Sequence, residues 1–292
     1  MSVSSGRVRV NSQARPTFPA SLRASYDDRD VLAALVRREL RTRYRRSILG
    51  WLWSLANPAF STIVYTFVFS VFLKVAPPPG VPSRLNSFPL FLLCGLLPWS
   101  FFVGAVTTSA SALLNSGGIV TKVRFAREHV VLAPVIALAA SLVIELFVVV
   151  AFLVSQARNP LPYLPVVAVL LVLLTSFTAG LSLLIAPLCV KFRDLSHLLS
   201  IVFMAWFYLT PIAYPIDRVP PTATVLGHQF DVHQLLLLNP MARFVQAFRN
   251  CLYDLTLPGR TTFVTLILSS FVVLFLGYRS FLRRSHRLIE FL

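Results

Sequence analysis

The sequence predicts an all-α integral membrane protein with six transmembrane helices, an N-terminal amphipathic interfacial helix, and short re-entrant outer helices between spans 5 and 6. Of the 292 residues, 56% are hydrophobic and 13% are charged, about half the charged fraction of a typical soluble domain. Apolar stretches of the about 20 residues that a membrane span requires recur along the chain. The charge is also uneven, with 27 basic and 11 acidic residues and a net charge of +16. These features exclude an ordinary soluble enzyme and a disordered chain.

The N-terminal part divides into a tail and a helix. Residues 1–26 hold scattered arginines among small residues without the apolar region of a secretory signal peptide, so we expect a flexible cytoplasmic tail. Residues 27–50 predict an amphipathic interfacial helix, because Asp27 and Asp28 favour a helix N-terminus and apolar residues then recur at helical spacing opposite arginines. A soluble helix on a globular core is the alternative, but an apolar run begins directly at Trp51.

Residues 51–292 are expected to form one six-span transmembrane domain. Prolines 98, 187 and 211 interrupt the apolar stretches and blur their limits. The segment 217–262 is too interrupted by proline to span, so we expect one or two short helices that dip into the membrane edge, where protein or water satisfies the backbone. The expected spans are 52–74, 88–113, 130–155, 162–189, 196–216 and 263–282.

The basic residues predict the orientation of these spans. Twenty of the 27 lie in the tail, the interfacial helix, the loops 114–129 and 190–195, and the C-terminus, and seven lie on the other side. The positive-inside bias therefore places both termini in the cytoplasm, which requires an even number of spans. The charge that would suggest nucleic acid in a soluble protein is thus assigned to orientation and lipid contact, with no nucleic-acid partner.

The sequence lacks common motifs for nucleotide binding, nucleophilic catalysis and metal binding. No GxxxxGK[ST] phosphate loop and no GxSxG nucleophile motif occurs, and the three cysteines have no metal-ligand spacing. One acid, Glu145, lies well inside a span, where a structural hydrogen bond is favoured over a proton-relay role. The chain is therefore expected to be passive or to take its energy from a partner.

Several segments resemble permeases of the ABC-2 type, in the branch that exports lipid-linked polysaccharides such as O-antigen and teichoic acid. Residues 38–53, RELRTRYRRSILGWLW, resemble the start of that family's first span. Lys122–Glu128, KVRFARE, resembles its cytoplasmic K-V-x-F-P-R-E segment, with Ala126 at the usual proline, which is expected to loosen the turn. Further similar segments are Phe192–His197, Pro211–Pro215, Asn239-Pro240 and Arg287–Leu292.

The resemblance implies a half-transporter in the bacterial cytoplasmic (inner) membrane. Two copies of the chain would form a homodimeric pathway, and two copies of a separate ATPase would supply ATP and Mg, so the chain itself would be no enzyme and hold no cofactor. The interfacial helix and the loop Asn115–Glu128 would contact the ATPase; simple attraction to anionic membrane lipid, ~1 kcal/mol per basic residue, is the alternative. The candidate coupling residues are Arg38, Arg41, Asn115, Ile119, Lys122, Val123, Phe125, Arg127 and Glu128.

A substrate pathway can also be assigned to residues. The resemblance implies a polyprenyl-diphosphate-linked glycan, whose anionic head group would be attracted to Arg43, Arg45 and Arg46. Aromatic rings would pack weakly on the C–H faces of sugars; the alternatives are interface belts and lipid-facing or core positions. The candidate rings are Tyr65, Trp99, Phe101, Phe102, Phe203, Trp206, Phe207 and Tyr208. Arginine outnumbers lysine 24 to 3, which hints at a GC-rich genome and a cell-wall galactan precursor as cargo.

Two other functions remain open at this point. One is an ABC-2 permease for a drug or a free lipid. The other, from a different class, is an integral-membrane polyprenyl-phosphate glycosyltransferase or phosphotransferase, for which paired loop acids are expected. Apart from the acids that cap the interfacial helix, the inner loops offer Glu128 and Asp194. A passive channel is disfavoured because no ring-forming polar filter is visible.

Overall fold

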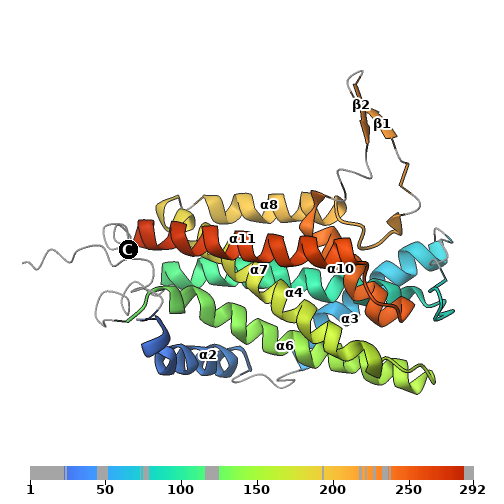
Figure 1. Cartoon of the computed structure of the whole chain (residues 1–292), viewed down its shortest axis with the longest axis horizontal. Coiled ribbons are helices and arrows are strands. Elements are labelled where there is room, and N and C mark those ends of the chain that lie inside the picture. The colour runs from blue at the N-terminus through green and yellow to red at the C-terminus, as the bar shows by residue number, and fades with distance from the viewer. Residues whose placement is uncertain are drawn as a thin grey trace, which may run out of the picture.

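The molecule is a bundle of helices that run roughly along one axis, with a small β-hairpin at one end (Figure 1). The computed structural model describes residues 23, 25–44, 52–72, 74, 79–115, 125–192, 194–216, 219–220, 222–225, 228–231, 236 and 238–285. For residues 43–44, 52–55, 57, 223–225 and 228–230 it describes the backbone alone.

In the described part of the chain, four helices are long and apolar enough to cross a membrane. They are α4 (Phe88–Asn115), α6 (Glu128–Ser155), α7 (Leu164–Lys191, preceded by the 3-10 turn η2, Leu161–Tyr163) and α11 (Arg260–Ser285). They coincide with the second, third, fourth and sixth expected spans. The chain is therefore a multi-pass membrane protein. Helix α4 is the most enclosed of the four and packs against both α6 and α7.

Two shorter apolar helices occupy the first and fifth expected spans. Helix α3 (Leu52–Thr66) continues into the π-helical turn η1 (Phe67–Phe72). Helix α8 (Leu195–Tyr208) ends well before residue 216, the expected limit of the fifth span. The cause is Pro211, which cannot continue a helix, together with the capture of nearby carbonyl groups by a side chain of another element.

The segment between α8 and α11 contains both helix and strand. Helix α10 (Pro240–Arg249) and the π-helical turn η4 (Asn250–Asp254) agree with the expected short helices. Strands β1 (Thr222–Val225) and β2 (His228–Asp231) form a short antiparallel hairpin, a local feature that the sequence did not predict. Helix α10 begins at Asn239 because the side-chain oxygen of this residue accepts hydrogen bonds from the Met241 and Ala242 amides, and Pro240 suits the first helical position.

Helix α2 (Arg29–Tyr44) is the amphipathic helix that the sequence predicts, and it packs along α6. Figure 1 shows α2, the first turn of α6 and the last turn of α11 at one end of the bundle, here named the α2 end. Helix α10 and the hairpin lie at the opposite end, here named the α10 end. Each long helix connects these ends, so a contact made at the α2 end bears on the full length of a span.

Helices α7 and α11 approach each other closely along their backbones. A Cβ atom added to Gly277 would lie 2.0 Å from the carbonyl oxygen of Gly180, and one added to Gly180 would lie 2.5 Å from the backbone of Leu274. The Ser270 hydroxyl also donates a hydrogen bond to the Leu173 carbonyl at 3.0 Å. Small residues allow this approach, and van der Waals packing is a main force between helices in a membrane.

Candidate functional site

The start of α6 is bound to α2 on one side. The amide of Ala126 donates a hydrogen bond to Oδ2 of Asp28 at 2.9 Å. The Ser25 hydroxyl, in the helical turn before α2, lies 2.9 Å from Nε2 of His129. His129 is only 1% exposed, so this contact is buried on the side of α6. The two hydrogen bonds attach the beginning of the amphipathic helix to the beginning of a membrane span.

The two residues between Ala126 and His129 are bound to α11 on the other side. The Tyr278 hydroxyl donates a hydrogen bond to Oε1 of Glu128 at 3.1 Å, and the pair is buried. Arg127 donates through Nη1 to the Ser285 carbonyl at 2.5 Å, in the last turn of α11. A carboxylate in the first turn of a helix is also favoured by the helix dipole. We name the segment Ala126–His129 with these four partners the junction.

The junction explains how the chain accommodates Ala126. Proline has no amide hydrogen, so a proline at this position could not donate to Asp28. Alanine supplies that donor, and the turn that the substitution was expected to loosen is held by a hydrogen bond to a carboxylate.

The predicted coupling residues are distributed around the junction. Arg127 is half-buried and Glu128 is buried in it, Phe125 is half-buried just before it, and Asn115 is exposed at the end of α4. Ile119, Lys122 and Val123 lie outside the described residues. Sequence reasoning missed Asp28, Ser25 and Tyr278. The acid at the helix N-terminus was a usable signal for Asp28, but nothing in the local sequence marks Tyr278.

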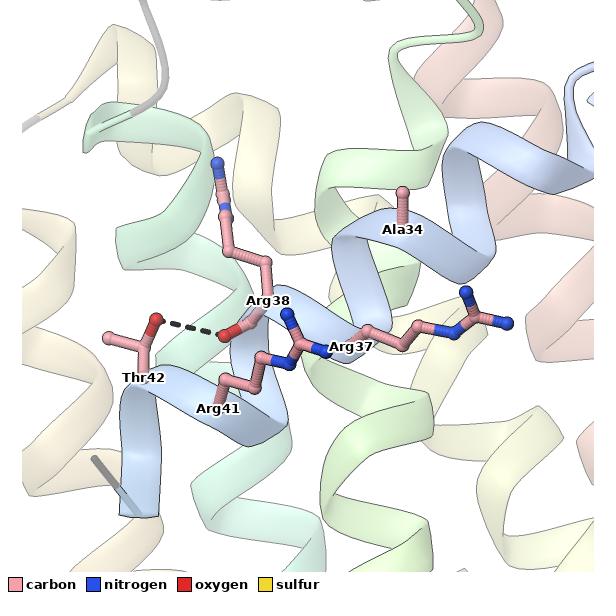
Figure 2. A pocket seen from close by; sticks show the side chains of 5 residues that line it. All are labelled: Ala34, Arg37, Arg38, Arg41 and Thr42. Atoms are coloured by element: carbon pink, nitrogen blue, oxygen red, sulfur yellow. Dashed lines mark hydrogen bonds between the residues drawn. The ribbon is translucent and has the colours of Figure 1, made fainter.

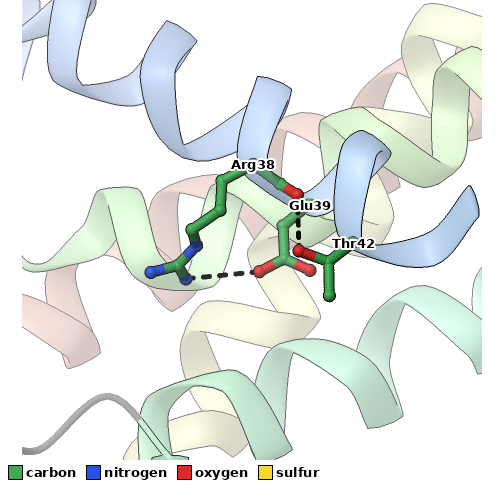
Figure 3. Close-up of polar contacts among 3 residues, drawn as sticks. All are labelled: Arg38, Glu39 and Thr42. Carbon is green, nitrogen blue, oxygen red and sulfur yellow. Dashed lines mark hydrogen bonds and ion pairs between the residues drawn. The ribbon is translucent and has the colours of Figure 1, made fainter. Parts of the chain in front are cut away.

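The outer face of α2 carries a basic hollow. Arg38 and Arg41 are exposed there, and with Arg37 they line a hollow of about 440 Å³ together with Ala34 and Thr42 (Figure 2). Arg38 forms an exposed ion pair with Glu39 at 3.4 Å, and the Thr42 hydroxyl donates to the Arg38 carbonyl at 2.8 Å (Figure 3). One weak ion pair leaves the hollow strongly basic, which suits an anionic partner.

Most predicted aromatic residues meet in one cluster between α4 and α8. Measured between ring centroids, Phe102 lies 5.3 Å from Trp206 and 5.6 Å from Phe203, and Trp99 lies 6.1 Å from Trp206. Tyr65 of α3 reaches this cluster through Phe207, at 6.0 Å. The sequence segments 99–102 and 203–208 are thus brought together, as edge-to-face and stacked pairs typical of a packed interior.

Exposure divides the predicted rings into two groups. Trp99, Phe101, Phe102 and Phe203 are at most 6% exposed and belong to the core of this chain. Tyr65, Trp206 and Phe207 are half-buried, and Tyr208 is 65% exposed. A ring must reach a surface to touch a passing sugar, so only the second group does so in this arrangement. Arg45 and Arg46 lie outside the described residues, as does the side chain of Arg43.

Asn239 connects the aromatic cluster to α10. Its Oδ1 accepts a hydrogen bond from Nε1 of Trp206 at 2.9 Å, and its amide nitrogen donates to the Thr210 hydroxyl at 3.0 Å. The same oxygen caps α10. One side chain therefore holds both the end of α8 and the start of α10.

Arg249 is a further residue that sequence reasoning missed. Its guanidinium is buried and donates to the carbonyls of Phe91, Pro211 and Ile212. Burial lowers the pKa of Arg249 to about 10, so the side chain stays charged at neutral pH. Within the described part of the chain, no group of three His, Cys, Asp or Glu side chains could hold a metal ion.

The structure defines a multi-pass membrane protein in which α2 is bound to the start of one span, α6, and that start is bound in turn to the end of another span, α11. The sequence profile of the ABC-2 type transporter family matches residues 30–253, so the chain belongs to this family, as the sequence motifs predicted. It is 29% identical over 269 residues to the O-antigen export system permease protein RfbA of Myxococcus xanthus, covering 92% of this chain and 98% of that protein. It is 28% identical over 267 residues to RfbA of Klebsiella pneumoniae, covering 90% and 95%. The polysialic acid transport protein KpsM of Escherichia coli is 22% identical over 264 residues, covering 89% and 95%.

Proposed function

We propose that this chain is the permease subunit of an ATP-driven exporter that moves a polyprenyl-diphosphate-linked polysaccharide across the bacterial cytoplasmic membrane. The relatives named for O-antigen export and polysialic acid transport align with about nine-tenths of the chain, which favours a glycan over a drug or free lipid. Membership in a transporter family also favours transport over a glycosyl- or phosphotransferase activity. The cargo proposed from composition is a cell-wall galactan precursor.

The proposal includes six spans with both termini in the cytoplasm. Helix α3 with η1 runs from Leu52 to Phe72, and at 1.5 Å per residue it covers about 30 Å, the thickness of the hydrocarbon core. Helix α8 is shorter, and the turn that follows it completes the crossing. Two copies of the chain close the pathway, and the exposed apolar side chains of α3, η1 and α8 face lipid or the second copy. Examples are Phe60, Ile63, Phe67, Val71, Ile201 and Met204.

The observation that carries this proposal is the junction. A separate ATPase, with ATP and Mg bound to it, closes during its cycle and can move the spans only through a rigid contact. Four consecutive residues supply such a contact, because Ala126 and His129 are bonded on the α2 side while Arg127 and Glu128 are bonded to α11. The ATPase would press on α2 and on the loop that precedes the junction.

The basic hollow of α2 is proposed as part of the same ATPase contact. Arg37, Arg38 and Arg41 line the same hollow and would pair with acidic side chains of the ATPase. The competing partner is the anionic phosphate of membrane lipid, which would attract each arginine by ~1 kcal/mol.

The substrate pathway is proposed along the accessible rings. Tyr208 and the half-buried Tyr65, Trp206 and Phe207 would touch the sugars, while the buried rings hold them in position. Arg43, Arg45 and Arg46 would attract the diphosphate at the cytoplasmic rim.

Reconstitution tests the function. The chain is purified with its proposed ATPase partner, placed in lipid vesicles, and supplied with lipid-linked glycan and ATP. The expected result is ATP-dependent transfer of glycan across the bilayer, and depletion in cells should cause a lipid-linked glycan to accumulate on the cytoplasmic side. Transfer that does not depend on ATP, or depletion that leaves every lipid-linked glycan unchanged, would contradict the proposal.

A further inference from the structure

Helix α11 is attached to the junction at two points on one face. Tyr278 and Ser285 are seven residues apart, which places them on the same side of the helix about two turns from each other. Tyr278 donates to Glu128, and Ser285 accepts from Arg127 through its carbonyl. Two bonds to consecutive residues fix both the distance and the rotation of α11 relative to the start of α6.

The Tyr278–Glu128 bond is the better protected of the two. Glu128 is 5% exposed and Tyr278 is 8% exposed, whereas Arg127 is half-buried. A hydrogen bond to a carboxylate is roughly twice as strong as one between neutral groups, and burial reduces its screening by water. Phe281, one turn further along α11, is fully buried with Val130 and Val131 of α6, so apolar contact supports the same pairing.

Beyond the junction, α11 passes the contact on to α7. Gly277, which adjoins Tyr278, lies directly against Gly180, and no side chain separates the two backbones there. Ser270 bonds the α7 backbone two turns further along. A close-packed backbone contact of this kind is rigid, so a displacement of α11 displaces α7 with it.

We infer that Tyr278 is a positioning residue that couples the junction to the α11–α7 pair, so that the first turn of α6, α11 and α7 move as one body during transport. The inference rests on the proposed function, because it assigns a route to the movement that the ATPase imposes. Movement applied at the loop reaches three spans through residues 127 and 128.

The test uses Tyr278→Phe in the complete complex with its ATPase in vesicles. This substitution removes one hydroxyl group and leaves the ring in place, and the buried position keeps the ATPase-facing surface unchanged. The expected result is normal assembly and normal ATP hydrolysis, with glycan transported per ATP reduced about tenfold, the factor that a lost hydrogen bond to a charged group predicts. The matched control is Tyr253→Phe, which removes a buried tyrosine hydrogen bond to the Leu85 carbonyl at the α10 end and should leave transport per ATP unchanged.

Glu128 supplies the second variant. Glu128→Gln keeps an oxygen that can accept the tyrosine hydrogen bond, and Glu128→Ala does not, so transport per ATP should be largely kept in the first and lost in the second. The double variant of Tyr278→Phe with Glu128→Ala should be no worse than Glu128→Ala alone, because both remove one contact. Unchanged transport per ATP in Tyr278→Phe, or equal coupling in the two Glu128 variants, would overturn the inference. Failure of the proposed function would appear differently, as absent ATP-dependent transport in the native complex.

Discussion

The guanidinium carbon of Arg249 lies 3.7 Å from the centre of the Phe91 ring, and the same group donates to the carbonyl oxygen of Phe91. Phe91 is in the first turn of α4, while the other two acceptors, Pro211 and Ile212, follow the end of α8. Carbonyl groups at interrupted helices need partners, especially at membrane depth where water is scarce. One planar side chain satisfies the carbonyls of Pro211 and Ile212, also bonds that of Phe91, and thereby joins α4, α10 and the break after α8.

Replacement of Arg249 should therefore destabilise the α10 end. Arg249→Lys keeps the charge but loses the planar fork and the stacking on Phe91, so we expect a loss of about 2 kcal/mol, and about 4 kcal/mol for Arg249→Ala. Thermal unfolding in detergent measures the effect. Arg260→Lys, at an exposed position, is the control. A native melting temperature for Arg249→Lys would show that the three carbonyls do not depend on the fork.

The hydrogen bond between Asp28 and Ala126 can be tested from both ends. Asp28→Ala removes the acceptor and Ala126→Pro removes the donor, so each should weaken the attachment of α2 by about 1 kcal/mol. Hydrogen exchange of the α2 amides reports that attachment. Combining the substitutions should add little to either one, because they delete the same bond. Fully additive effects would mean that Asp28 acts through some other contact.

Because α7 and α11 approach so closely, a single methyl group added between their backbones should strongly destabilise the protein. Gly277→Ala would place Cβ 2.0 Å from the Gly180 carbonyl oxygen, and since backbone cannot move aside cheaply, we expect a loss of about 3 kcal/mol or more. Gly104→Ala on α4 is the matched control, because no atom lies within 4 Å of the added Cβ. The amount of folded protein in membranes and its melting temperature compare the two. Similar values for both variants would refute the backbone contact.

Charge reversal on α2 distinguishes its two candidate partners. Arg37→Glu, Arg38→Glu and Arg41→Glu together should reduce recovery of the ATPase with the permease at least about tenfold. Recovery of the native pair should fall as the salt concentration rises, because salt screens the charges. Arg158→Glu, on the α6–α7 connection at the far end of the bundle, is the control. Undiminished recovery of the ATPase, combined with weaker association with anionic vesicles, would assign the hollow to lipid.

The two groups of aromatic rings should respond differently to truncation. Tyr208→Ala removes an exposed ring and should lower glycan export while the melting temperature stays near native. Phe102→Ala empties a site with no exposed surface and should cost about 3–5 kcal/mol of stability. Export in vesicles and thermal unfolding, measured on the same preparations, separate the effects. Native export by Tyr208→Ala would argue against sugar contact at this ring.

An element could be predicted when the interactions that form it are local in the sequence, and was missed when they join distant residues. Helices α4, α6, α7 and α11 coincide with expected spans. A long apolar run in a membrane favours a helix, because a helix satisfies its own backbone hydrogen bonds. The end of α8 was predicted too late because it depends on Arg249, 38 residues from Pro211. The hairpin was missed because the prolines around residue 220 signal an interruption without specifying which structure follows it.

The candidate site divides in the same way. Arg127 and Glu128 were marked by a local motif, whereas Tyr278 stands 150 positions away in an apolar helix with no local signal. The sequence by itself determined the membrane class, the family and the amphipathic helix, because these depend on composition, periodicity and short motifs. Tertiary structure alone decided that residues 126–129 are bound to both α2 and α11, and that the rings of α4 and α8 form one buried cluster. Each of those contacts joins groups that are distant in sequence, and only the packed bundle brings them within hydrogen-bond or van der Waals range.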